Sequence, residues 1–269
     1  MNYYKFLRLR KFIFFSGLVL FQASYAYAQE RIVFVLSGQS NMVGLASTDR
    51  IPESMIEVPS NVTYVLDGEV SDFSTNGNGR FGPEVSFAHE ISAQWPEKEI
   101  VLIKYAVGGA SLYAWSPEWT EEGANITLNA NFGNLYSNLM DMISDQKILA
   151  PENFTAILWM QGERDARFPE AGTNYFENFS NLINHLRNDI GNPQLPFIFG
   201  QINPPASRYP ALSDVRAAQR EAIAAVPSTH MIATDDLTKL DDNLHYDADG
   251  IIEMGIRFAR AFIDNYSIN

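Results

Sequence analysis

Residues 32–43 read Ile-Val-Phe-Val-Leu-Ser-Gly-Gln-Ser-Asn-Met-Val, an apolar run that stops at Ser37-Gly38 and resumes at Met42. This pattern is typical of a buried strand that passes through a tight turn into a helix. Ser40 lies on that turn, at the carboxyl edge of the predicted sheet, where backbone N–H groups at a helix start can receive a developing negative charge. A serine before a helix is most often an N-cap, so the turn alone does not distinguish a nucleophile from a cap.

Apolar segments alternate with helix-like segments along the rest of the chain. This βαβ rhythm predicts a parallel sheet covered by helices on both faces, in a single domain over residues 29–269. The predicted strands are 32–37, 62–66, 100–106, 154–160, 197–201 and 231–234. The predicted helices are 85–95, 135–147, 175–190, 215–225 and 251–265, each beside a proline or glycine that marks a stop or a start.

The composition supports one domain with a full core, because the chain has 269 residues of which 46% are hydrophobic. It has no cysteine, which excludes disulfides, redox switching and a thiol nucleophile. The formal net charge is −13, and no basic stripe offsets it. Since an acidic surface repels phosphate groups, nucleic acid and anionic membranes are not expected as partners.

Residues 1–28 differ in composition from the rest. A basic start is followed by an apolar run at 12–21 and by Ala26-Tyr27-Ala28, an A-x-A cleavage site. These features predict a secretory signal peptide cut after Ala28, and therefore a secreted or periplasmic protein without membrane contact after cleavage. A retained anchor is the alternative, which the short apolar run disfavours. Cleavage would change the formal charge from −13 to −17, because this segment holds four basic and no acidic residues.

Three long irregular stretches, 46–60, 71–83 and 111–132, interrupt the alternation. Connections of this length in a compact domain are often functional. The third follows a predicted strand and contains Tyr113 and Trp119 among its aromatic residues. These side chains could form a wall for a sugar ring or could pack the loop against the domain, and the sequence favours neither.

Distinctive polar residues and glycines follow three predicted strands and also occupy one late loop. They are Ser40, Gly108-Gly109, Gln161-Gly162-Glu163 and Asp242-Asn243-Leu244-His245. Because the carboxyl ends of strands in an open parallel sheet meet at one crevice, we expect these groups to lie together.

These residue types fit nucleophilic acyl transfer, which needs a hydroxyl, a base, a carboxylate that holds the base, and donors for the oxyanion. His245 and Asp242, three residues apart, fit the base and the carboxylate for Ser40. The N–H of Ser40 and one N–H of the Gly108-Gly109 pair fit the oxyanion hole, with the Gln161 side chain as a third donor.

Other interpretations of the acidic residues stay open at this point. Glu163 could orient His245 or the loops, or could belong to a structural ion pair with Arg164. The aspartates around Asp242 could form a calcium loop, but their spacing does not match the EF-hand pattern. We therefore expect no metal.

Several blocks of residues together resemble the SGNH hydrolase superfamily, and more closely its sialate O-acetylesterase and acetylxylan esterase branch, carbohydrate esterase family 6. The blocks are Gly38-Gln39-Ser40-Asn41-Met42, Gly108-Gly109-Ala110-Ser111 with Trp115, Trp159-Met160-Gln161-Gly162-Glu163-Arg164-Asp165-Ala166 and Asp242-x-x-His245-Tyr246, with Gly82-Pro83-Glu84 and Arg216-x-x-Gln219 as supporting matches. The similarity spans nearly all of the chain after the predicted signal peptide.

The resemblance implies a three-layer α/β/α sandwich with a flavodoxin-like parallel sheet and a triad of Ser40, His245 and Asp242. It implies hydrolysis of acetyl esters on sugars, and no cofactor is needed. The wider superfamily has asparagine in its third block, where this branch and this chain have Gln161. Supporting or substrate-binding roles are expected for Asn41, Trp115 and Glu163.

The expected substrate is an acetylated plant or algal polysaccharide such as xylan, with acetylated sialic acid as the alternative. An α/β-hydrolase lipase is disfavoured, because Met42 replaces the second glycine of its Gly-x-Ser-x-Gly turn. The alternative from another class is a secreted carbohydrate-binding protein without catalysis, which the aromatic loop would serve equally well.

Overall fold

The computed structural model describes residues 30–73, 79–145 and 151–266 of the chain. The predicted signal peptide, residues 1–28, lies outside the described residues. Across the described ranges, no helix combines the length and the apolar character needed to span a bilayer.

A mostly parallel sheet forms the middle layer. Within the described ranges it has seven strands in the order β4-β3-β6-β1-β7-β8-β9. Their bounds are β1 (Arg31–Gly38), β3 (Val62–Leu66), β4 (Glu69–Ser71), β6 (Glu99–Ala106), β7 (Phe154–Met160), β8 (Phe197–Gly200) and β9 (Thr229–Ile232). Every neighbouring pair is parallel except β3 and β4, which are antiparallel. The central strands are almost wholly apolar because both of their faces are covered.

Each predicted strand is present, and the expected fold class is confirmed. The strand β9 lies two residues earlier than predicted, and the short edge strand β4 was not predicted. The strand order also differs at one point from the flavodoxin-like order, in which the second strand of the chain pairs with the first. Here β6 lies between β1 and β3. After β1 the chain forms β3, which is not adjacent to β1, and the later strand β6 occupies the position between them.

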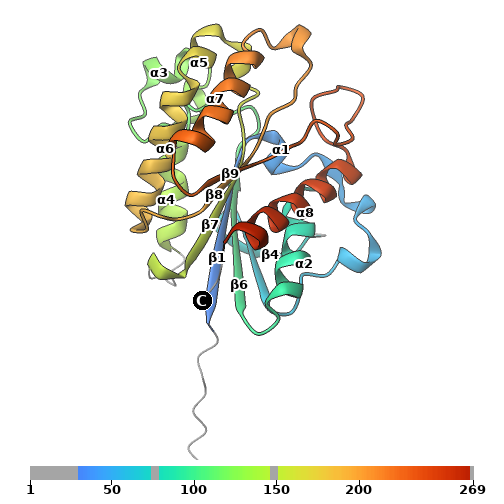
Figure 1. Ribbon diagram of the computed structural model, residues 1–269. Coiled ribbons are helices and arrows are strands. Elements are labelled where there is room, and N and C mark those ends of the chain that lie inside the picture. Colours follow the sequence, from blue (N-terminus) through green and yellow to red (C-terminus); the bar gives the residue numbers. More distant parts are fainter. Residues whose placement is uncertain (1–29, 74–78, 146–150, 267–269) are drawn as a thin grey trace, which may run out of the picture.

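Helices cover both faces of the sheet (Figure 1). One face carries α2 (Glu84–Gln94) and α8 (Ala248–Asn265), and the other carries α4 (Leu135–Asp145), α6 (Tyr175–Ile190) and α7 (Leu212–Ala225). The loops contain the short helices α1 (Ser40–Val43), α3 (Glu121–Asn125) and α5 (Pro169–Thr173), and the small hairpin of β2 (Ala46–Ser47) and β5 (Arg80–Phe81). The expected three-layer sandwich is therefore observed.

Aromatic side chains join the layers. On one face, Phe34 of β1 makes edge contacts with Phe87 of α2 and Phe262 of α8, each with 5.0 Å between ring centroids. On the other face, Phe179 of α6 contacts Phe199 of β8 at 5.0 Å. Such edge-to-face pairs stabilise the core beyond their buried area.

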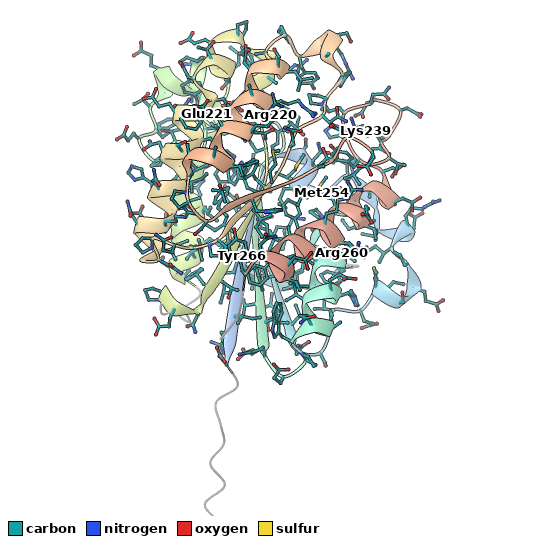
Figure 2. All side chains as sticks on the ribbon, viewed as in Figure 1. Arg220, Glu221, Lys239, Met254, Arg260 and Tyr266 are labelled. Carbon is teal, nitrogen blue, oxygen red and sulfur yellow. The ribbon has the colours of Figure 1, made fainter. Side chains whose placement is uncertain are left out.

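Helix α8 shows how sequence pattern produces this packing. Asp247 caps its first turn by accepting a hydrogen bond from the N–H of Gly250 at 2.9 Å. Met254 is fully buried on the side that packs on the core, whereas Arg260 is exposed (Figure 2). The helix is therefore amphipathic, with an apolar side that packs on the core and a polar side that faces solvent.

Gly38 fixes the turn at the end of β1. Its φ is +140°, and a Cβ atom there would lie only 2.2 Å from the carbonyl oxygen of Met160. This close approach lets the N–H of Gln39 donate to the same oxygen at 2.8 Å. The turn that follows therefore lies at the carboxyl edge of the sheet, beside the end of β7.

Candidate active site

Ser40, Asp242 and His245 meet at the carboxyl edge of the sheet. The Oγ of Ser40 lies 3.0 Å from Nε2 of His245, and Nδ1 of His245 lies 2.5 Å from Oδ2 of Asp242. Ser40 opens α1, whereas the other two residues belong to the loop that precedes α8. The side chains of His245 and Asp242 are 18% and 39% exposed, so a substrate can reach the imidazole.

Asp242 is held as a carboxylate by its own loop. Its Oδ1 accepts hydrogen bonds from the N–H groups of Leu244 and His245, both at 2.9 Å. Partial burial acts to raise the pKa of Asp242, but these two N–H bonds and the neighbouring imidazole outweigh it, so the pKa is lowered. The ionised carboxylate favours the tautomer that carries the proton on Nδ1 of His245 and leaves Nε2 free to accept the Ser40 proton.

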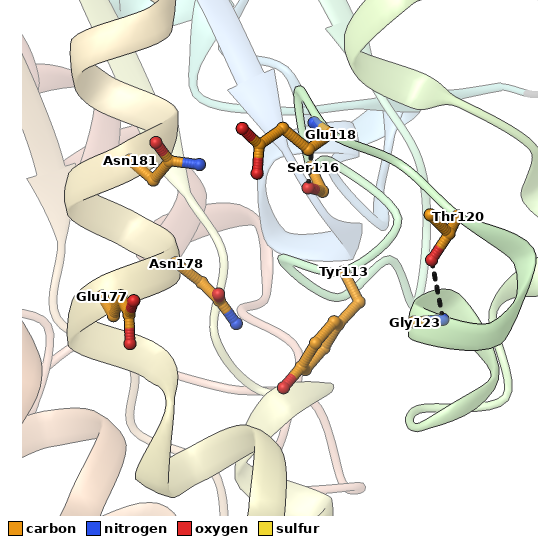
Figure 3. Close-up of a pocket in the computed structure, with 8 residues that line it drawn as sticks. All are labelled: Tyr113, Ser116, Glu118, Thr120, Gly123, Glu177, Asn178 and Asn181. Carbon is orange, nitrogen blue, oxygen red and sulfur yellow. Dashed lines mark hydrogen bonds between the residues drawn. The ribbon is translucent and has the colours of Figure 1, made fainter.

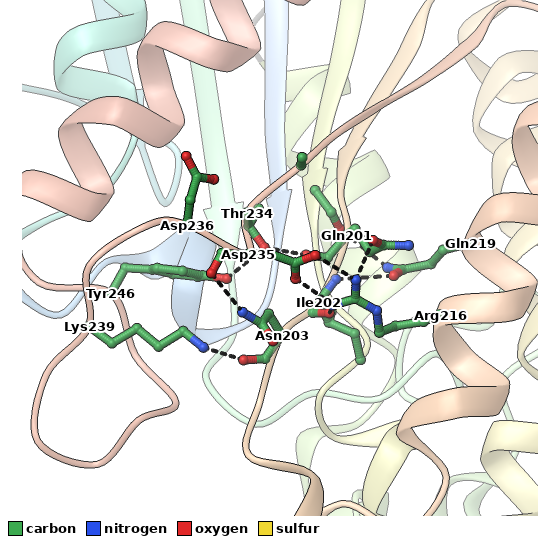
Figure 4. Close-up of polar contacts among 12 residues, drawn as sticks. Gln201, Ile202, Asn203, Arg216, Gln219, Thr234, Asp235, Asp236, Lys239 and Tyr246 are labelled. Carbon is green, nitrogen blue, oxygen red and sulfur yellow. Dashed lines mark hydrogen bonds and ion pairs between the residues drawn. The ribbon is translucent and has the colours of Figure 1, made fainter.

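A polar network anchors the loop that carries the aspartate and the histidine (Figure 4). Arg216 of α7 forms a two-pronged ion pair with Asp235, at 2.7 and 2.8 Å, and donates to Oε1 of Gln201 at 2.7 Å. Thr234 donates to the carbonyl of Gln201 at 2.6 Å and accepts from the hydroxyl of Tyr246 at 2.8 Å. The start of the loop is thereby tied to Gln201 after β8 and to α7, and its far end is tied to its start through Tyr246 and Thr234.

Asn41 and Glu163 connect this loop to α1. Nδ2 of Asn41 donates to Oε1 of Glu163 at 2.7 Å and to the carbonyl of Leu244 at 3.3 Å, and Oδ1 accepts from the N–H of Tyr246 at 3.3 Å. Burial raises the pKa of Glu163, and its Oε2 is buried with no hydrogen-bond partner among the described residues. Asn41 therefore holds the chain on both sides of His245, and Glu163 fixes Asn41.

A cavity of about 370 Å³ opens beside Ser40 and the imidazole of His245. It is lined by Gln39, Ser40, Leu45, Gly108, Gly109, Glu163, Arg164, Arg167, Tyr209, Leu244 and His245. Within the described ranges, the backbone N–H groups of Ser40, Gly108 and Gly109 donate to no protein acceptor. Gly109 has a φ of +75°, a conformation that favours glycine. These free N–H groups can receive the oxygen of a polarised carbonyl.

Gln161 does not reach this cavity, which contradicts its expected role as an oxyanion donor. Its side chain is fully buried, where Nε2 donates to the carbonyl of Ala110 at 3.0 Å and to the carboxylate of Asp165. Burial also raises the pKa of Asp165 to about 7. Oε1 of Gln161 accepts from the hydroxyl of Tyr175 at 3.2 Å. Both amide hydrogens are used, so this residue fastens the loop after β6 to the loop after β7.

Gln39 lines the cavity, although the sequence interpretation gave it no role. Its Oε1 accepts hydrogen bonds from the N–H groups of Gly162 at 3.2 Å and Arg164 at 3.1 Å. Its Nε2 has no partner in the described part of the chain, and the side chain lines the cavity beside Ser40. The signal was its place in the block before the nucleophile, but the direction of a side chain leaving a strand end cannot be read from that block.

Trp115, expected to support the site or bind substrate, is fully buried. Its ring makes edge contacts with Tyr105 at 5.6 Å and Trp159 at 5.4 Å between centroids. It supports the site by packing the loop after β6 on the sheet, and it cannot form a wall for a sugar. Tyr113 of the same loop is half-buried and lines a separate cavity.

Two aspartates at the start of the late loop form ion pairs with arginines. Asp235 pairs with Arg216, and Asp236 pairs with Arg257 at 2.6 Å. In the portion of the chain that the structure covers, no group of three or more His, Cys, Asp or Glu side chains is placed to hold a metal ion.

Comparison with known proteins identifies the family. Residues 30–264 match the family model described as carbohydrate esterase, sialic acid-specific acetylesterase. A probable carbohydrate esterase of Arabidopsis thaliana is 26% identical over 258 residues, which cover 87% of this chain and 91% of that protein.

Solved structures share the fold. An X-ray structure of an Arabidopsis thaliana protein superposes with a TM-score of 0.72 at 23% identity, covering 88% of this chain and 100% of that one. A carbohydrate acetylesterase from Xanthomonas citri gives a TM-score of 0.68 at 22% identity, covering 88% of this chain and 58% of that one. The chain therefore belongs to the sialic acid-specific acetylesterase family of carbohydrate esterases, and it is a carbohydrate acetylesterase, a carboxylic ester hydrolase, with an SGNH-type fold.

Proposed function

We propose that this protein is a serine esterase that removes O-acetyl groups from a carbohydrate, with Ser40 as nucleophile, His245 as base and Asp242 as the carboxylate that orients the base. The observation that carries the proposal is the pair of contacts from Ser40 Oγ to His245 Nε2 at 3.0 Å and from His245 Nδ1 to Asp242 Oδ2 at 2.5 Å. The blocks around Ser40 and Glu163 support its placement in carbohydrate esterase family 6.

The reaction follows from these contacts in two halves. Nε2 of His245 takes the proton of Ser40 as Oγ bonds to the acetyl carbonyl carbon, and the tetrahedral intermediate carries a negative oxygen. The bond to the sugar oxygen then breaks, and that oxygen leaves with the proton from His245. Water attacks the acetyl-serine in the same way, so acetate is released and the Ser40 hydroxyl is restored.

Gln39 takes the place of Gln161 in the proposed oxyanion hole. The free N–H groups of Ser40 and of Gly108 or Gly109 supply the backbone donors. Nε2 of Gln39 supplies the side-chain donor, because its Oε1 is already fixed by two backbone N–H groups and the amide lines the cavity. A donor held in this way needs no rearrangement when the oxyanion forms.

We expect Gln39→Glu to lower kcat for an aryl acetate by about a hundredfold or more, the usual effect of losing one oxyanion donor. The carboxylate keeps an oxygen for the N–H groups of Gly162 and Arg164 but has no N–H to donate. The measurement is the steady-state kinetics of Gln39→Glu, Gln39→Ala and the unchanged protein with the aryl acetate. Near-normal turnover by Gln39→Glu together with slow turnover by Gln39→Ala would assign Gln39 an anchoring role only.

The proposed substrate is an acetylated polysaccharide such as xylan. A second candidate, O-acetylated sialic acid, is favoured by Arg164 and Arg167, which both line the catalytic cavity. Neither guanidinium forms an ion pair with a carboxylate among the described residues. Nε and Nη2 of Arg164 donate to the carbonyl of Thr127 at 2.9 and 2.6 Å. The groups available to a substrate carboxylate are therefore Nη1 of Arg164 and the guanidinium of Arg167, which lies over the Tyr209 ring.

Acetate release from acetylated xylan, O-acetylated sialic acid and an aryl acetate tests the proposed function. We expect the purified protein to release acetate from the aryl ester and from one of the two carbohydrates. If it cleaves the aryl ester and neither carbohydrate, the proposed substrates are wrong. If it cleaves none of the three, the esterase mechanism itself is wrong.

The basic start, the apolar run and the A-x-A site of residues 1–28 support export of the protein. Expression of the full chain in a bacterial host followed by N-terminal sequencing of the exported form tests this. A mature chain beginning at Gln29 is expected. Retention of the complete chain in the membrane fraction would show an uncleaved anchor instead.

A further inference from the structure

A second cavity of about 360 Å³ lies between the loop that follows β6 and the outer side of α6 (Figure 3). Its lining is Tyr113, Ser116, Glu118, Thr120, Gly123, Glu177, Asn178 and Asn181. None of these residues lines the catalytic cavity. The loop contributes the three hydroxyl groups, and α6 contributes the two amides.

The lining matches the hydrogen-bonding pattern of a neutral sugar. It offers hydroxyls, two amides, two carboxylates and one aromatic ring, which can accept from and donate to sugar hydroxyls and can cover a ring face. It contains no lysine, arginine or histidine. Since Glu118 and Glu177 repel anions, a carboxylated or phosphorylated ligand is disfavoured here.

Asn178 provides a donor that has no acceptor. Its Nδ2 is buried and forms no hydrogen bond within the described residues. Figure 3 shows this amide extending from α6 across the cavity towards Tyr113, while the carboxylate of Glu118 points from the loop towards Asn181. A buried N–H without an acceptor is unfavourable, so a small turn of this amide towards an oxygen of a bound ligand would stabilise it.

The opposite wall is held in place by hydrogen bonds. The hydroxyl of Tyr113 accepts from Nδ2 of Asn174 at 3.0 Å, which fixes the ring and leaves the hydroxyl hydrogen free to donate. Thr120 caps α3 by accepting from the N–H of Gly123 at 3.0 Å. A ligand would therefore meet groups already in position, which lowers the cost of binding.

The cavity is also close to the catalytic groups along the chain. Tyr113 follows Gly109 by four residues, so their Cα atoms are separated by at most about 14 Å even for a fully extended segment. An oligosaccharide of a few sugar units is long enough to cover this separation between the two cavity linings. This places the second cavity within reach of the same glycan chain that presents its acetyl group to the nucleophile.

We propose that this cavity is a subsite for a neutral sugar unit of the acetylated glycan, with Asn178 and Tyr113 as its principal contacts. The proposal rests on the proposed esterase function. In this proposal the enzyme recognises a sugar unit that is separate from the cleaved ester. The lining of the subsite favours a neutral xylan-type chain over an acidic one.

The test compares an acetylated xylo-oligosaccharide with an aryl acetate, which is too small to reach the subsite. For Asn178→Asp, which keeps the side-chain shape but replaces the donor by a charged oxygen, we expect KM for the oligosaccharide to rise about tenfold with kcat little changed. The kinetic constants for the aryl acetate should stay at their original values. Tyr113→Ala should have the same effect, and Asn188→Ala serves as the control, because Asn188 is exposed on the same helix and lines neither cavity.

The outcomes separate the subsite from the esterase function. Unchanged KM for the oligosaccharide in both Asn178→Asp and Tyr113→Ala, with normal aryl ester hydrolysis, would overturn the subsite and leave the esterase intact. A lower KM for an acetylated acidic oligosaccharide than for the neutral one in the unchanged enzyme would overturn the neutral assignment. If the unchanged enzyme did not hydrolyse the aryl ester, the proposed function would instead be contradicted.

Discussion

Ser40→Ala is expected to lower kcat for an aryl acetate by roughly 10⁵-fold or more, the effect seen when a serine hydrolase loses its nucleophile. The Oγ of Ser40 is the oxygen that Nε2 of His245 faces at 3.0 Å, so no other hydroxyl takes its place. The residual rate would come from the oxyanion donors and from binding alone. Initial rates at saturating aryl acetate, with the circular dichroism spectrum as a folding check, provide the measurement.

Ser47→Ala is the matched control, because Ser47 is exposed on the nearby hairpin and does not line the catalytic cavity. A serine-reactive phosphonate should add one equivalent to the unchanged protein at Ser40 and none to Ser40→Ala, as measured by mass spectrometry. Wild-type turnover by Ser40→Ala, or phosphonate attached to another serine, would show that the Ser40 assignment is wrong.

Lys104→Met is expected to lower the free energy of unfolding by about 3–5 kcal/mol, the usual cost of leaving one partner of a buried ion pair alone. Nζ of Lys104 donates to Oε2 of Glu84 at 2.6 Å and to the carbonyl of Val43 at 2.9 Å, and the two charged side chains are only 2% and 1% exposed. The substitution therefore leaves a buried carboxylate without its cation. Urea unfolding followed by circular dichroism measures the change.

Lys98→Met is the control, because Lys98 pairs with Glu30 on the surface, where one partner is 56% exposed. Its loss should cost less than about 1 kcal/mol. The double substitution Lys104→Met with Glu84→Met should recover part of the lost stability, since both charges are removed together. If Lys104→Met and Lys98→Met lowered the free energy of unfolding equally, the buried ion pair would contribute no more to stability than the exposed one.

The fold was predictable because its strands are buried on both faces. The segments 62–66 and 154–160 are apolar except for one threonine each, and their observed bounds agree with the prediction. The edge strand β4 was not predicted, because its three residues are mostly exposed and carry no apolar pattern. The position of β6 between β1 and β3 depends on which strands pair over long sequence separations, and a local pattern does not specify that.

The site was predictable to the extent that it depends on residue type at strand ends. Ser40, Asp242 and His245 were expected to meet because parallel strands end at one edge, and the observed contacts bring them together. The difference lies in the direction of the two glutamine side chains. Gln161 turns into the core towards Asp165, whereas Gln39 lines the cavity, and that direction is set by tertiary packing rather than by either local sequence.

The proposed nucleophile and base lie 205 residues apart in the chain, and the loop that carries the base directly precedes α8. During synthesis the segment that contains His245 leaves the ribosome after every strand of the described sheet. A chain shortened by a stop before residue 245 would therefore contain Ser40 without the imidazole that is proposed to activate it. Under the proposed mechanism, hydrolytic capacity therefore requires translation to pass residue 245.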